Sequence, residues 1–437
     1  MPLRIDKALS RLAAIRPAVG IGKLTRIMPT WLEADGPNVA VGTLCMLNAD
    51  DNGKTMYAEV VRIDASGVAL VPYSETSDLA LGARVEAVAG KPTLPVGMEF
   101  LGRAVDALGQ AIDNGPPIQA VHHEPLNPDP PLPLDRESRN EPVETGIKAI
   151  DALMPLGSGQ RIGIFAASGV GKTSLLSQLI RQVQADVCVC CLVGERGREV
   201  ESIWTNELSG EARARSVLVA ATSDQAAAVR VRAVHQAIAI ARHFRAQGLS
   251  VFLVLDSITR FAMALREVGL AAGEPPTLRA YTPSVFSIIP RVVEQAGALR
   301  SGGSITAVMT ILAETDEVDD PLSELMKSLL DGHYVLSRDL AQKGHFPAID
   351  PLMSVSRNAH KLMSSEHRRA AQRAQSLLAL YQKNRTLIDA GLYSAGANKD
   401  IDDAIKAQPL LEAFTRQKLD EAVSAETTLD ALHKAID

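Results

Sequence analysis

Five apolar segments of strand length alternate with helical patterns in the middle of the chain, from about Val143 to Arg357. Side chains in these segments are almost continuously apolar, which is typical of strands that are covered on both faces. Strands that alternate with helices predict a parallel sheet between two layers of helices. The five segments read RIGIF, VCVCCLV, SVLVAAT, SVFLVLD and SITAVMTILA. The pattern therefore predicts an α/β core.

The regions on either side of this core have different patterns. Between Gly22 and Val88, turn-forming stretches separate short β-rich runs, which predicts a small antiparallel β-barrel. A proline-rich stretch from Pro116 to Pro133 predicts an extended connector. Beyond Asn358 the pattern is helical and rich in alanine, which predicts a closing helical domain. We therefore expect an N-terminal arm at 1–20, a barrel at 21–92, the α/β core at 93–357 and the helical domain at 358–437.

The N-terminal arm has an amphipathic pattern. Ile5, Leu9 and Leu12 fall on one helical face, while arginine and lysine residues fall elsewhere around the helix. Such a segment either packs as a plain terminal helix or docks on a partner or an acidic membrane surface.

Composition narrows the class of protein. The chain has 437 residues, 46% of them apolar, so we expect two or three folded domains. A net charge of −6 and only 4% aromatic residues argue against a nucleic-acid partner. No apolar run approaches the roughly 18 residues of a membrane span. The three cysteines of DVCVCCLV would alternate between the faces of a buried strand, which predicts inert core thiols rather than metal ligands, in a cytoplasmic protein.

The stretch AASGVGKTSLL, residues 166–176, predicts a phosphate-binding loop (P-loop). The alternative is an ordinary glycine-rich turn, because Ala166 stands where the motif has its first glycine. The context favours the P-loop, since an apolar strand precedes the stretch and a helical pattern follows it. Lys172 would then bind the β- and γ-phosphates, and Thr173 would ligate Mg²⁺. The remaining predicted nucleotide-binding residues of the loop are Ser168, Gly169, Val170, Gly171 and Ser174.

Two further strands end in acidic residues. SVFLVLDS ends in Asp256, which either orders the Mg²⁺ shell or merely caps a helix. In LVGERGREVESIW, a predicted buried strand is followed by a charged loop. This loop is either a solvated turn or part of the site at the carboxyl edge of the sheet. There Glu195 would orient the attacking water, with Arg196 and Arg198 holding it and Glu199 in the outer shell of Mg²⁺.

Taken together, the chain resembles the ATPases of bacterial type III secretion, flagellar and injectisome, which are relatives of the catalytic subunit of the rotary ATP synthase. The resemblance runs from about Gly22 to the C-terminus. The motifs that carry it are TGIKAIDALMPLGSGQRIGIF, AASGVGKT, LVGERGREV, LDSITRFAMALREVGLAAGEPP, YTPSVF and GHFPAIDPLMSVSR. It implies a RecA-like P-loop ATPase domain between the barrel and the helical domain.

The resemblance also implies roles for single residues. Glu195 matches the catalytic glutamate of the family, and Lys172, Thr173 and Asp256 match its nucleotide and Mg²⁺ residues. Arg196 is also expected to take part in catalysis, as the neighbour of Glu195. Phe346 stands where the family has an aromatic ring that stacks on adenine, and Tyr393 would form the other wall. Arg357 matches the arginine that reaches the γ-phosphate of a neighbouring subunit. Segment 271–286 would line a central opening. The open alternatives are that Phe346 is plain core and that Arg357 pairs with a local carboxylate.

The implied function is a Mg²⁺-dependent ATPase that powers protein export as a homohexamer. Implied partners are a regulatory or stator protein on the arm, a central stalk protein, the export gate and chaperone–cargo complexes. The implied location is the cytoplasmic side of the bacterial inner membrane, with peripheral contact. The motifs TRFAMALRE and AYTPSVF favour the flagellar branch over the injectisome branch. Other candidates are a non-catalytic rotary ATPase subunit, which Glu195 argues against, and a hexameric RNA translocase, which the acidic composition argues against.

Overall fold

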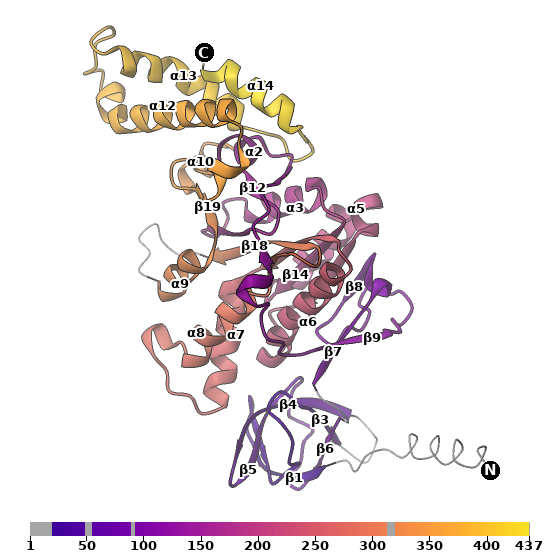
Figure 1. Cartoon of the computed structure of the whole chain (residues 1–437). Helices are drawn as coiled ribbons and strands as arrows, with labels where there is room; N and C mark the ends of the chain where they lie inside the picture. The colour runs from indigo at the N-terminus through magenta and orange to yellow at the C-terminus, as the bar shows by residue number, and fades with distance from the viewer. Residues whose placement is uncertain (1–19, 49–54, 89–91, 313–319, 437) are drawn as a thin grey trace, which may run out of the picture.

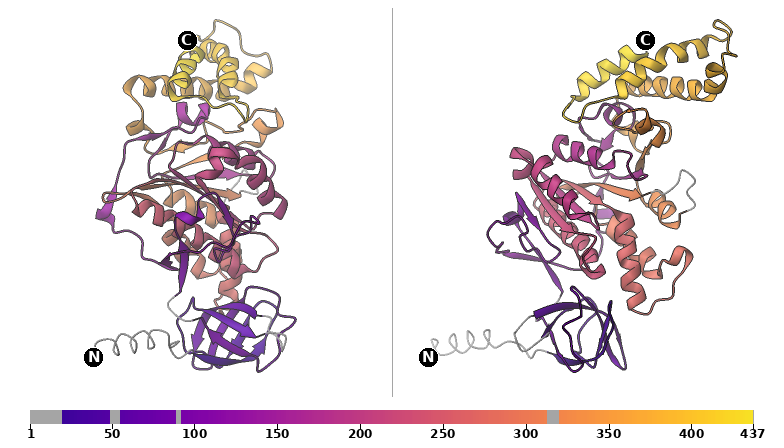
Figure 2. Two further views of the ribbon diagram at one scale, coloured as in Figure 1. Left: turned by 90° about the vertical axis from the view of Figure 1, so that its right-hand side faces the viewer. Right: turned by 180° about the vertical axis from the view of Figure 1, so that it is seen from behind.

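The computed structural model describes residues 20–48, 55–88, 92–312 and 320–436. Residues 1–19 of the expected arm therefore lie outside the described residues. A barrel, a central sheet domain and a group of helices follow one another along the molecule (Figure 1). Views from two other sides show the same order (Figure 2). The α/β fold class with these three parts, as predicted, is confirmed.

The barrel is closed and antiparallel, with strand order β1-β2-β5-β4-β3-β6. Its core contains Leu32, Leu47 and Leu70, each fully buried. Alternate residues of β1, β2 and β4 point inward, which matches the short β-rich runs of the sequence. The strands are β1 (Ile21–Ile27), β2 (Leu32–Ala34), β3 (Leu44–Asn48), β4 (Thr55–Asp64), β5 (Gly67–Pro72) and β6 (Arg84–Ala87).

The central domain is built on a sheet of ten strands within the described part of the chain. Its main path runs β20-β19-β13-β18-β16-β14-β15-β8, and every pair from β19 to β8 is parallel. Strands β10 and β17 extend it antiparallel beside β18. The strands of this domain are β7 (Thr93–Val96), β8 (Arg103–Val105), β9 (His122–Pro125), β10 (Arg136–Glu137), β11 (Pro142–Val143), β12 (Leu156–Gly157), β13 (Arg161–Ala166), β14 (Val187–Val193), β15 (Ser216–Ala221), β16 (Ser250–Asp256), β17 (Gly297–Leu299), β18 (Ser304–Leu312), β19 (Gly332–Leu336) and β20 (Val355–Ser356).

All five strands predicted from apolar runs are present, as β13, β14, β15, β16 and β18. The prediction missed β8, which has only three residues, and β19, in which buried and half-buried residues alternate. It was wrong to treat the proline-rich stretch as a plain connector. That stretch supplies β9, which pairs with β7, and β10 follows it directly and pairs with β17.

Helices cover both faces of the sheet, and the alternation of side chains along each strand divides the core in two. Val189 and Cys191 of β14 point into one hydrophobic cluster with α6, α7 and α8. Cys188 and Cys190 point into the other, with α2, α3 and the C-terminal helices. Burial raises the pKa of the Cys188 thiol to about 11, which agrees with an inert core thiol. The helices are α2 (Lys148–Leu153), α3 (Lys172–Gln182), α4 (Gly197–Ser202), α5 (Gly210–Ala214), α6 (Ala227–Ala246), α7 (Ile258–Ala271), α8 (Pro283–Val293), α9 (Pro321–Leu329), α10 (Arg338–Gln342), α11 (Ala359–Leu362), α12 (Ser365–Asp389), α13 (Lys399–Thr415) and α14 (Ala425–Ile436).

The C-terminal helices α12, α13 and α14 pack on one another and on α2 at the end of the molecule far from the barrel (Figure 1). Ala374, Leu411 and Leu432 are buried where these helices meet. Among the described residues, no helix is both long enough and apolar enough to cross a membrane.

Candidate active site

The glycine loop of 167–171 lies at the carboxyl edge of the sheet, between the end of β13 and the start of α3. Gly169 and Gly171 have φ values of 80° and 91°, in the left-handed region where a side chain is strained. Val170 is only 2% exposed and anchors the loop in the core, while Ser168 faces solvent. The loop thus directs its backbone and the first turn of α3 outward, which is the geometry that binds phosphate.

Lys172 begins α3, and its ammonium group contacts two carboxylates. Nζ lies 3.2 Å from Oε1 of Glu195 and also contacts Oδ1 of Asp256. Both acids are buried, Glu195 at 7% and Asp256 at 2% exposure. They come together because β14 pairs with β16 in parallel, with Leu192 beside Asp256, so both strands end at the same edge. The structure therefore brings the predicted lysine and both predicted acids into one cluster.

Thr310 of β18 completes the contacts of Asp256. Its hydroxyl donates to Oδ1 of Asp256 at 2.6 Å. The register explains this bond, because Leu255 pairs with Met309 and the next residues of the two strands are neighbours. Sequence reasoning did not single out Thr310, although it stands in a segment predicted as a core strand, where a polar residue is unusual.

Glu195 is held by Arg260, a residue that sequence reasoning missed. Nε of Arg260 lies 3.6 Å from Oε1 of Glu195. The arginine passes directly over Gly194, where an added Cβ would lie 2.7 Å from its Cδ, so glycine is required there. Arg260 stands in the first turn of α7, where the helix dipole disfavours a cation, and this was the available signal.

The expectation that Arg196 and Arg198 hold Glu195 needs correction. Arg196 and Arg198 are exposed and Glu199 is half-buried, all at the start of α4. Among the described residues, the side chains that contact the Glu195 carboxylate belong to Lys172 and Arg260. The chain turns into α4 directly after Glu195, which carries its neighbours away from the carboxylate.

The residues present fit a Mg²⁺–nucleotide pair. Thr173 is exposed next to Lys172 in the first turn of α3, and the carboxylate of Asp256 lies beside the lysine ammonium. A hydroxyl and a carboxylate oxygen are the hard donors that Mg²⁺ prefers. Ser174 follows on the same exposed turn. Glu199 stays a prediction as an outer-shell residue.

A cavity of about 840 Å³ opens beside the glycine loop. That is a typical volume for a nucleotide-sized ligand. Its lining comes from α3, from the loop before β20 and from the segment that follows α13. The lining residues are Gly171, Ser174, Leu175, Gln178, Gly344, Phe346, Pro347, Ala413, Arg416, Gln417, Lys418, Leu419, Asp420 and Glu421.

Phe346 lines this cavity and is 41% exposed, so it is not plain core. Its ring lies against the glycine loop, since a Cβ on Gly171 would be 3.1 Å from its Cε1. The lining also includes Leu419, which sequence reasoning missed. Gln417 fixes that segment, because its backbone N–H donates to the carbonyl of Phe346 at 2.9 Å and its amide donates to the carbonyl of Gly146 at 2.6 Å.

Tyr393 does not line the cavity, so its expected position as the second wall is corrected. It lies in the loop between α12 and α13, where its hydroxyl is 2.9 Å from the carbonyl of Asn398 and 3.0 Å from Oδ1 of Asp402. The side chain is used to close that loop. Residues 416–421 stand at the cavity instead.

Arg357 lies at the opposite edge of the sheet from the glycine loop. Its backbone N–H donates to the carbonyl of Asp331 at 3.0 Å, and the N–H of Asp331 donates to the carbonyl of Arg161 at the start of β13. The glycine loop follows Ala166, five residues further along β13, or about 16 Å. Nη2 of Arg357 donates to the carbonyl of Lys327 at 2.9 Å, rather than to a carboxylate, and the side chain is exposed.

Family models match each part of the chain. The ATP synthase alpha/beta family matches with its nucleotide-binding domain at residues 146–356 and its beta-barrel domain at residues 25–88. The T3SS EscN ATPase C-terminal domain matches residues 363–434.

Known proteins match along almost the whole length. The chain is 42% identical over 412 residues to a flagellum-specific ATP synthase of Bacillus subtilis, which covers 94% of both chains. It is 41% identical over 433 residues to a type 3 secretion system ATPase of Xanthomonas euvesicatoria, covering 99% of this chain and 97% of that one. A solved structure of the assembled ATPase EscN in complex with its central stalk EscO, from enteropathogenic E. coli, matches with a TM-score of 0.87 and 38% identity over 95% of this chain and 100% of that chain.

Fold, site and relatives define an ATPase of the ATP synthase alpha/beta family. Within that class, the chain belongs to the type III secretion ATPases, whose members include flagellar and injectisome enzymes.

Proposed function

We propose that this chain hydrolyses Mg²⁺-bound ATP in a homohexameric ring and thereby energises type III protein export in the flagellar branch. The observation that carries the proposal is the cluster of Lys172, Glu195 and Asp256 beside a nucleotide-sized cavity. The assembled state of the similar ATPase EscN supports the ring.

In this mechanism the glycine loop of 167–171 acts as a P-loop. Lys172 and the backbone N–H groups of the loop bind the β- and γ-phosphates, and Phe346 stacks on the adenine. Thr173 and Asp256 would hold Mg²⁺, which would supply positive charge to neutralise the phosphate oxygens. Glu195 orients the attacking water and accepts its proton, and Arg260 fixes the direction of that carboxylate. Arg357 reaches the γ-phosphate in the neighbouring subunit.

The site favours catalysis over simple nucleotide binding, because Glu195 is buried and held by two cations next to the phosphate loop. A subunit that only binds nucleotide has no use for a carboxylate in that position. An RNA translocase would use a basic surface with stacking rings, which the composition does not offer.

The Glu195→Gln variant tests this proposal. Glutamine keeps the size of the side chain but cannot accept the proton, so turnover should fall by roughly 10²- to 10⁴-fold while ATP binding persists. Hydrolysis and nucleotide binding are measured on the purified variant and on wild type, with and without Mg²⁺. Near-wild-type hydrolysis by the variant would refute the assignment of Glu195.

The branch and the partners complete the proposal. The motifs TRFAMALRE and AYTPSVF support the flagellar branch, and the injectisome branch is the alternative. Deleting the gene and scoring motility against effector secretion separates the two. A central stalk protein would occupy the opening of the ring, as EscO is the central stalk of EscN. The arm would bind a regulatory protein, and the helical domain would face the export gate and chaperone–cargo complexes at the cytoplasmic face of the inner membrane.

A further inference from the structure

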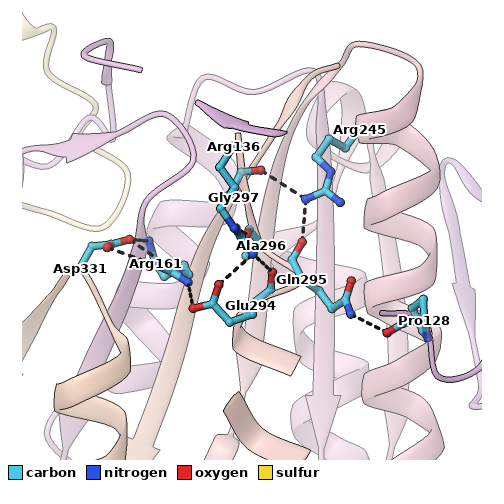
Figure 3. Close-up of polar contacts among 9 residues, drawn as sticks. All are labelled: Pro128, Arg136, Arg161, Arg245, Glu294, Gln295, Ala296, Gly297 and Asp331. Atoms are coloured by element: carbon cyan, nitrogen blue, oxygen red, sulfur yellow. Dashed lines mark hydrogen bonds and ion pairs between the residues drawn. The ribbon is translucent and has the colours of Figure 1, made fainter. Parts of the chain in front are cut away.

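A chain of alternating charges joins the end of α8 to the amino edge of the sheet (Figure 3). Glu294 follows the last residue of α8. Its Oε1 accepts from Nη1 of Arg161 at 2.6 Å, and its Oε2 lies 2.8 Å from Nη2 of Arg136. Arg161 turns its Nε to Oδ2 of Asp331 at 3.3 Å. These four residues alternate in charge in the order Arg136, Glu294, Arg161 and Asp331, and we call this set of contacts the relay.

The guanidinium of Arg161 connects the end of α8 to the start of β19. It contacts Glu294 after α8 and Asp331 before β19. The side chain of Arg161 is 17% exposed. Burial lowers the pKa of Arg161, but the carboxylates of Asp331 and Glu294 more than offset this effect and the pKa is raised, so the group stays charged. A lysine has one nitrogen on a flexible stem and could not hold both carboxylates in this fork.

Asp331 connects Arg161 to Arg357. Its side chain also accepts from the backbone N–H of Arg161 at 2.9 Å, and its carbonyl accepts from the backbone N–H of Arg357 at 3.0 Å. Strand β20 leads into Arg357 and pairs with β19 through Gly332 and Ser356. A shift of Asp331 therefore moves the main chain that carries the Arg357 side chain.

At the other end of the relay, hydrogen bonds fix the backbone that directly follows α8. Arg136 donates to the carbonyls of Glu294 and Ala296 at 2.6 and 2.9 Å. Arg245 of α6 donates to the carbonyl of Gln295 at 2.6 Å (Figure 3). These bonds fix the backbone at and directly after Glu294, so they hold its carboxylate beside Arg161.

We infer that Glu294, Arg161 and Asp331 are positioning residues for Arg357. The inference rests on the proposed role of Arg357 across the subunit boundary. The relay sets where the guanidinium of Arg357 stands, and it makes no contact with the nucleotide itself. Its loss should therefore slow turnover without weakening ATP binding.

A double-mutant cycle tests the relay, because it separates an effect through Arg357 from an independent one. Wild type, Glu294→Gln, Arg357→Ala and the double variant are assembled into rings, and kcat and KM for MgATP are measured. Couplings of this kind correspond to changes of about tenfold, so Glu294→Gln should lower kcat by about tenfold with KM unchanged. In the Arg357→Ala background it should change kcat by less than about twofold.

Arg161→Lys is the second variant and should reproduce the result of Glu294→Gln, since it keeps the charge but loses the fork. Gln295→Met is the matched control at the same helix end. It removes a 3.0 Å bond to the carbonyl of Pro128 but touches no member of the relay, so kcat should stay at the wild-type value. Ring formation and thermal melting of each variant show that assembly is intact.

Three outcomes would overturn the inference. One is an equal loss of kcat from Glu294→Gln in both backgrounds, which would show that Glu294 acts independently of Arg357. Another is an unchanged kcat in both Glu294→Gln and Arg161→Lys. The third is a loss in Gln295→Met as large as in these variants, which would show a general structural effect. If Arg357→Ala alone keeps wild-type turnover, the proposed role of Arg357 fails, and that result is distinct from a failed relay.

Discussion

The two edges of the central sheet differ in how closely their predicted site residues are grouped. At the carboxyl edge, Lys172 contacts both Glu195 and Asp256, and all three come from this chain. At the amino edge, Arg357 is exposed and its side chain rests on the carbonyl of Lys327, with the length of β13 between it and the glycine loop. Charge that develops on a phosphate is stabilised most strongly by groups placed next to it. The difference supports our proposal that one chain carries complementary parts of two separate sites.

Removing the arginine of the amino edge should give the largest effect. Arg357→Ala should reduce turnover on the order of a thousandfold, as is usual for arginines that reach a γ-phosphate, while ATP binding persists. Specific activity of wild type should rise with protein concentration as rings form, and the variant should stay slow at every concentration. Arg373→Ala, which removes another exposed arginine, is the control. Turnover of Arg357→Ala within about threefold of wild type would show that the amino edge takes no part.

Removing the aromatic ring of Phe346 at the carboxyl edge should give a smaller effect, and this effect should be on ATP binding. Phe346→Ala should raise KM for ATP about tenfold, because stacking on a base contributes about 1–3 kcal/mol. Phe346→Tyr keeps the ring and should leave KM close to wild type. Steady-state kinetics with both variants decide the question, and an unchanged KM in the alanine variant would remove Phe346 from the nucleotide site.

The smallest effect is expected from Tyr393→Ala. This side chain closes the loop before α13 through Asp402 and stands outside the cavity, so KM for ATP should change by less than about twofold. The loss of its hydrogen bonds should lower the free energy of unfolding by about 1 kcal/mol. A rise in KM comparable to that of Phe346→Ala would show that Tyr393 does take part in nucleotide binding.

The sequence predicted most of the carboxyl edge because that edge follows from local patterns. Continuous apolar runs marked β13, β14 and β16, and parallel strands end at a common edge, so the residues after them meet. Short or alternating strands such as β8 and β19 carry too little apolar signal to be recognised. Arg260 was missed because its contact with Glu195 depends on how α7 leaves the sheet.

Contacts between distant segments were the hardest to predict. The amide of Gln178 approaches the carbonyl of Lys418, 240 residues further along the chain, and no periodic pattern marks that polar segment. Tyr393 was misplaced because an aromatic residue in a helical domain matches a pocket wall only loosely. The placement of Arg357 at the far edge likewise required the pairing of β20 with β19.

Mixing two inactive variants tests the central claim that each active site takes groups from two chains. Arg357→Ala and Lys172→Ala should each be inactive as pure rings. In mixed rings, some interfaces join an intact Lys172 to an intact Arg357 of the neighbour, so part of the wild-type ATPase activity should return and should depend on the mixing ratio. If mixed rings form and no activity returns at any ratio, Arg357 does not act across the boundary, and the account is contradicted.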